Sequence, residues 1–132
     1  MKKKIFDCVT FFQENLQMEL RFNILNDVVD KFVVCESAYD HRGREKKINF
    51  SKDKYPEIIS KIEHIIITKK FPEKKTPWQN QSWQREYILE GIKDADKNDF
   101  IMFSDPDEIP NPEKLKNFNP RKKYSIFLQN MY

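Results

Sequence analysis

The sequence predicts an α/β fold with a mainly parallel sheet flanked by helices, and two observations lead to this expectation. Short apolar runs alternate with segments whose apolar residues recur at helical spacing, a pattern typical of parallel strands joined by crossover helices. The connections are also long enough for right-handed βαβ units. We therefore expect the first four strands to pair in the order three-two-one-four, within one domain covering residues 1–132.

The expected elements follow from the apolar runs and their spacing. Strands are predicted at 5–12, 31–36, 62–68 and 99–104, with a short edge strand at 48–50 and a last strand at 124–131. Helices are predicted from about residue 16, at 55–61, and at 80–96 behind an Asn80 cap.

In the first helix, Met18, Phe22 and Leu25 share one face, which we expect to pack on the sheet, while Arg21 lies off that face. The last apolar strand has no helix after it to cover the sheet. We therefore expect a domain truncated at its C-terminus that exposes apolar surface and self-associates.

Composition excludes several classes of protein. With 39% hydrophobic residues and 11 Phe the chain can build a core, and its two Gly exclude both a P-loop and a glycine-rich dinucleotide fingerprint. The net charge of +3 is mild and the lysine runs suit solvated surface, so no nucleic-acid partner is expected.

The two cysteines indicate the setting of the protein. Cys8 and Cys35 lie inside apolar runs, which predicts burial as small hydrophobic residues, and no zinc-type spacing is present. No apolar run approaches the length of a membrane span. We therefore expect a reducing, cytoplasmic location.

An acidic turn follows the fourth strand and carries the strongest functional signal. Because proline cannot donate to a strand ladder, Pro106 and Pro110 place Asp105, Asp107 and Glu108 beyond the strand's carboxyl end. Ligands of open α/β sheets bind at that edge. Two aspartates separated by one residue suit a shared Mg²⁺ or Mn²⁺, although a solvated turn capped by Asp105 is the alternative interpretation.

This turn and other segments together resemble glycosyltransferase family 17. Asp105-x-Asp107-Glu108-Ile109-Pro110 after an apolar strand and Ser104 is similar to the core motif of that family. Further similar segments occur in the same order, namely Glu19-x-Arg21, Leu25 to Val33, Glu36-Ser37, Gly43 and Lys46, Pro77-Trp78, and Gln84-Arg85. The resemblance spans about residues 6–110, and at Asp40 the chain departs from the threonine of the family pattern.

The resemblance implies a GT-A-like, Rossmann-like fold and an enzyme. It implies transfer of a sugar from a nucleotide sugar, with UDP-GlcNAc as one candidate, to a glycan or glycoconjugate acceptor. It further implies a divalent metal, Mn²⁺ or Mg²⁺, and inversion at the anomeric carbon.

The candidate site residues fall into three roles. Asp105 and Asp107 are the predicted metal ligands. Glu108 is the candidate catalytic base; the alternatives are that it supports the metal ligands from behind and that the base lies in sequence beyond Tyr132. The candidates for binding the donor are Glu36, Ser37, Lys46, Arg21, Arg85 and Asp105. Each has a structural alternative: a strand cap for Glu36 and Ser37, a salt bridge for the two arginines, and solvated surface for Lys46.

Two other functions are consistent with the sequence. One is a non-catalytic nucleotide-sugar-binding or interaction module. The other is a haloacid-dehalogenase-type phosphatase, which also places D-x-D after a strand but usually has its nucleophile early in the chain. If the transferase interpretation holds, we expect these residues to bind donor and to show little transfer, because acceptor contacts usually come from later segments.

Overall fold

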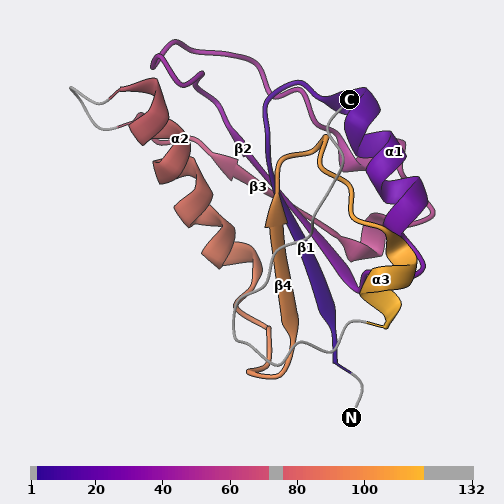
Figure 1. Cartoon of the computed structure of the whole chain (residues 1–132). Coiled ribbons are helices and arrows are strands. Elements are labelled where there is room, and N and C mark those ends of the chain that lie inside the picture. The colour runs from indigo at the N-terminus through magenta and orange to yellow at the C-terminus, as the bar shows by residue number, and fades with distance from the viewer. Residues whose placement is uncertain (1–2, 72–75, 118–132) are drawn as a thin grey trace.

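The structure is a computed structural model that describes residues 3–71 and 76–117. Its four strands are β1 (Ile5–Phe11), β2 (Lys31–Ser37), β3 (Ile62–Ile67) and β4 (Phe100–Ser104). They form one sheet in the order β3-β2-β1-β4, and all three pairings are parallel (Figure 1). The predicted α/β class and strand order are confirmed.

Helices cover both faces of the sheet (Figure 1). On one face lie α1 (Asn15–Leu25), the 3-10 turns η1 (Lys52–Lys54) and η2 (Ile59–Lys61), and α3 (Pro112–Lys116). On the other lie α2 (Pro77–Glu86) and the 3-10 segment η3 (Tyr87–Gly91). Because side chains alternate along a strand, β1 contributes Val9 and Phe11 to the core under α1, and Phe6 and Cys8 to the core under η3.

Helix α1 buries the face that the sequence predicts, with one addition. Met18, Phe22 and Leu25 pack in the core as expected. Arg21 is buried on the same face, so its expected position off that face is wrong. Its spacing from Met18 and Leu25 places it on that face. A buried partner of opposite charge, described below, offsets the cost of burying the guanidinium.

Helix α2 begins earlier than predicted and ends earlier too. Thr76 is its N-cap, Pro77 follows, and Gln79 completes a capping box, so the expected Asn80 cap is wrong. Asn80 instead lies buried within the helix, and its side-chain Nδ2 donates to the backbone carbonyl of His41 at 2.7 Å. After Glu86 the chain tightens into η3 and ends at Gly91, short of the predicted end at residue 96.

Three other expectations meet different outcomes. Residues 48–50 form no strand, because the amides of Asn49 and Phe50 donate to the Glu36 carboxylate instead of a ladder. The predicted helix at 55–61 is reduced to the 3-10 turn η2. The predicted strand at 124–131 lies outside the described residues.

Two remaining expectations concern the cysteines and membrane-spanning segments. Cys8 and Cys35 are free and buried, as predicted. Within residues 3–71 and 76–117, no helix has the length and apolar character needed to cross a membrane.

Candidate functional site

The acidic turn lies where the sequence places it, beyond the carboxyl end of β4. Ser104 is the last residue of β4 and pairs with Val9 of β1, so the turn begins beside the central strand. The chain then reverses, and the amide of Glu108 donates to the carbonyl of Asp105 at 3.0 Å. The Glu108 carboxylate in turn accepts the amide of Asp105 at 3.0 Å, so the turn is closed by hydrogen bonds in both directions.

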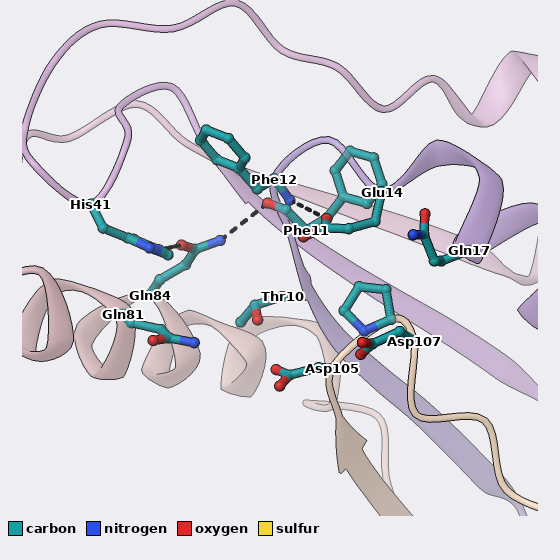
Figure 2. A pocket seen from close by; sticks show the side chains of 11 residues that line it. Thr10, Phe11, Phe12, Glu14, Gln17, His41, Gln81, Gln84, Asp105 and Asp107 are labelled. Carbon is teal, nitrogen blue, oxygen red and sulfur yellow. Dashed lines mark hydrogen bonds between the residues drawn. The ribbon is translucent and has the colours of Figure 1, made fainter. Parts of the chain in front are cut away.

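A pocket of about 270 Å³ opens beside this turn (Figure 2). It lies between the carboxyl end of β1, the acidic turn, helix α2 and the loop after β2. Its lining residues are Thr10, Phe11, Phe12, Glu14, Gln17, His41, Gln81, Gln84, Asp105, Pro106 and Asp107. Both predicted metal ligands therefore line one concave site, which is the arrangement that ligand binding at a strand edge requires.

The environment of Asp105 favours a cation next to it. Its side chain is 46% exposed, and Nη2 of Arg85 lies 3.8 Å from its Oδ1. Burial raises the pKa of Asp105 above 3.8, the charge of Glu108 acts in the same direction, Arg85 opposes it, and Asp107 adds to the rise. The carboxylate is thus incompletely compensated by Arg85, and a divalent ion would offset the remaining repulsion.

The donor set fits a magnesium or manganese ion that binds together with its ligand. In the part of the chain that the structure describes, no three His, Cys, Asp or Glu residues gather into a group able to hold a metal. Asp105 and Asp107 supply two carboxylates at the pocket. That number suits Mg²⁺, which usually takes one or two protein carboxylates and fills its shell with water and phosphate oxygens.

Arg21 lies beneath the acidic turn and is not among the residues that line the pocket. It is 0% exposed, and its guanidinium forms a bidentate ion pair with Asp7. The remaining N–H groups donate to the carbonyls of Asp105 and Glu108 and to Oγ of Ser104, so all five N–H groups have acceptors. These contacts favour the alternative for Arg21, a structural ion pair, and donor binding by Arg21 stays a prediction.

Glu36 is likewise internal. It is 0% exposed; Oε1 contacts the Phe50 amide and Nε2 of His64, and Oε2 accepts from the Asn49 amide and Nζ of Lys46. Both carboxylate oxygens have partners inside the protein, which favours a structural role for Glu36, and its donor contact stays a prediction. Burial would raise the pKa of Glu36, but the hydrogen bonds from His64, Asn49, Lys46 and Phe50 outweigh it and hold the pKa below 4.5.

Three other predicted donor-binding residues, Ser37, Lys46 and Arg85, are not among the residues that line the pocket. Ser37 is buried, and its Oγ accepts the amide of Tyr39 at 3.0 Å. Nζ of Lys46 donates to Glu36 and to the carbonyl of Lys47, and it lies 5.4 Å from the centre of the Phe12 ring. Of the two arginines, Arg85 is the one that approaches the Asp105 carboxylate, and its guanidinium lies 5.2 Å from the centre of the Phe103 ring.

Several pocket residues were not predicted from the sequence. Nε2 of His41 lies 2.6 Å from Oε1 of Gln84, whose Nε2 donates to the carbonyls of Cys35 and Phe11. Since those carbonyls fix the amide orientation, Nε2 of His41 carries the proton. Thr10 could have been found by the rule that pointed to Asp105, because it too lies at the carboxyl end of a central strand.

Fold and site together define a parallel α/β domain with an acidic pocket at the carboxyl edge of its sheet. The model of the family described as "Glycosyltransferase family 17" matches residues 1–128, and the chain belongs to this family. The membership agrees with the resemblance and replaces the phosphatase alternative.

Curated relatives agree with this family. The chain is 24% identical over 118 residues to "Beta-1,4-mannosyl-glycoprotein 4-beta-N-acetylglucosaminyltransferase" of Rattus norvegicus and to that of Homo sapiens. Its identity to the protein of the same name from Mus musculus is 23%. Each match covers 82% of this chain and 22% of the relative, so the chain spans about a fifth of their length. No solved structure matches the chain, and GT-A therefore stays a prediction within the α/β class.

Proposed function

We propose that this chain is the nucleotide-sugar-binding part of a metal-dependent glycosyltransferase. The donor would be a UDP-sugar, with UDP-GlcNAc favoured by the name of the relatives, and the acceptor a glycan or glycoconjugate. Family membership supports the transferase class. The single structural observation that carries the metal and donor assignment is the presence of Asp105 and Asp107 on the wall of one pocket at the sheet's carboxyl edge.

Each part of the pocket would have its own task in binding. Asp105 and Asp107 would hold Mn²⁺ or Mg²⁺, which when bound offsets the charge that develops on a departing nucleoside diphosphate. Arg85, whose Nη2 lies 3.8 Å from Oδ1 of Asp105, would pair with a phosphate of the donor. Polar groups for the rest of the donor would come from four other lining residues, Thr10, His41, Gln81 and Gln84. Inversion and a cytoplasmic location belong to this proposal as expectations.

Replacing the two aspartates tests the assignment. We expect Asp105→Asn and Asp107→Asn each to weaken binding of UDP in the presence of Mn²⁺ by roughly tenfold or more, about 1.4 kcal/mol, because each removes charge from the cation site. Isothermal titration calorimetry would measure this, with Asp53→Asn, an exposed residue of η1, as the matched control. If both variants bind Mn²⁺ and UDP as tightly as the parent, the turn is structural and the proposal is wrong.

One observation favours the non-catalytic binding module as a second candidate. Glu108, the predicted base, does not line the pocket, and its carboxylate accepts a hydrogen bond from the Asp105 amide. The pocket residue Glu14 similarly accepts the amides of Phe12 and Gln13. An assay of sugar transfer and donor hydrolysis separates the candidates: donor binding without transfer supports the module, and robust transfer by this chain supports the enzyme.

A further inference from the structure

We propose that Arg21, held in place by Asp7, is the positioning residue that sets the geometry of the acidic turn and thereby the metal and diphosphate affinity of the pocket. The part of this inference that concerns affinity rests on the proposed function. The part that concerns the turn rests on hydrogen bonds alone.

Asp7 is an unusual residue in its position. It lies in the row of β1 side chains that faces α1, between the core residues Ile5 and Val9, and it is 1% exposed. A carboxylate there is costly unless paired and hydrogen-bonded. Arg21 supplies that pair through two bonds, from Nε at 2.7 Å and from Nη2 at 2.6 Å. Because the guanidinium is planar, this fork fixes where the other N–H groups point.

Those remaining groups point at the acidic turn from below. Nη1 donates to the carbonyl of Asp105 at 3.2 Å and to that of Glu108 at 2.7 Å, and Nη2 donates to Oγ of Ser104 at 2.6 Å. The two carbonyls bracket Pro106 and Asp107. Since Pro106 has no N–H and the turn lies outside the sheet ladder, Arg21 connects both ends of the turn to β1 and α1.

Stability alone does not require this charged pair. Apolar residues of similar volume often replace a buried ion pair without loss of stability, whereas they cannot donate to two backbone carbonyls. Removing one partner leaves a buried unpaired charge, which destabilises strongly for a reason unrelated to the turn. A test of positioning must therefore remove both charges together.

The test uses the double variant Asp7→Leu/Arg21→Met in the full chain, with Lys61→Met as the matched control. Lys61 also anchors backbone carbonyls, those of Asn26 and Val29, but it precedes β3 at the other end of the sheet. Thermal unfolding reports stability, amide hydrogen exchange of Asp105 and Glu108 reports the turn, and calorimetry with Mn²⁺ and UDP reports affinity.

We expect the double variant to fold, its Asp105 and Glu108 amides to exchange faster, and its Mn²⁺-dependent UDP affinity to fall roughly ten- to a hundredfold. Lys61→Met should keep both the exchange rates of the turn and the affinity, whatever it does to stability. If the double variant does not fold, Arg21→Lys takes its place, because a lysine can still pair with Asp7 but cannot reach both turn carbonyls at once.

Unchanged exchange at both turn amides would overturn the inference, since Arg21 would then be structural only. Faster exchange with unchanged affinity would overturn the link to binding. If the parent itself binds no Mn²⁺ and UDP, the proposed function fails, and the exchange measurement still decides whether Arg21 positions the turn.

Discussion

At the scale of single residues, Glu108 has two candidate roles that one pair of substitutions separates. As a turn cap it needs only an oxygen that accepts the Asp105 amide, which glutamine also provides. We expect Glu108→Gln to keep the parent's affinity for UDP with Mn²⁺. Glu108→Ala should lose about 0.5–1 kcal/mol of stability and roughly tenfold in affinity, measured by thermal unfolding and calorimetry.

A measurement of sugar transfer distinguishes a turn cap from a catalytic base at Glu108. If Glu108→Gln keeps donor affinity but abolishes sugar transfer in a chain that otherwise transfers, Glu108 is the base predicted from the sequence.

The buried Glu36 carboxylate makes the free energy of unfolding depend on pH. Its pKa in the folded protein is held below the unfolded value of 4.5, so its stabilising contribution is complete above that value and is lost as pH falls through the folded pKa. At neutral pH we expect Glu36→Gln to reduce the free energy of unfolding by about 1.5–3 kcal/mol, because buried hydrogen bonds to a charged group are lost.

Urea unfolding of parent and variant between about pH 7 and pH 3 measures this effect. The difference between them should shrink as the solution becomes more acidic, because the parent's Glu36 is then protonated. The exposed control Glu57→Gln should show no such difference. A gap that stays constant down to the lowest pH would contradict the assigned ionisation.

At the scale of elements, the contact between η3 and the sheet depends on the absence of a side chain at Gly91. A Cβ there would overlap Cγ1 of Val33 and lie 3.0 Å from Cδ1 of Ile65. Val33 is buried and β-branched, so it has little freedom to move aside. We expect Gly91→Ala to destabilise by about 1–3 kcal/mol through overpacking, measured by denaturant unfolding.

The control for this element is Glu90→Ala, one residue earlier at an exposed position of η3. It should change stability by less than about 0.5 kcal/mol. Equal effects of the two substitutions would show that η3 does not pack on the sheet as described.

At the scale of the whole molecule, the two cysteines report global unfolding. Burial raises the pKa of Cys8 to about 12, helped by the charge of Asp7, and burial alone raises that of Cys35 to about 12. Since the thiolate is the reactive form, we expect neither to react with iodoacetamide at neutral pH in the folded protein. Mass spectrometry should find both labelled in guanidinium chloride, and rapid native labelling of either would contradict the packing.

The sequence by itself determined the elements whose signal is local. Apolar runs and helical spacing predicted the four parallel strands, their order and the buried face of α1, and two prolines placed Asp105 and Asp107 at the strand's carboxyl end. The start of α2 could also have been predicted from the sequence, because Thr76, Pro77 and Gln79 form a helix N-terminus signal. A search for apolar spacing alone overlooks that signal.

Only the tertiary structure decided what the charged residues do. Arg21 and Glu36 look like ligand-binding residues in a linear motif, yet their partners lie far along the chain: Glu108 for Arg21, and Asn49 and His64 for Glu36. Whether a charge faces a ligand or the interior depends on which polar groups the fold brings to it, because an unpaired buried charge is too costly to keep. That pairing arises from the packing of β1, α1 and the acidic turn, and no local pattern encodes it.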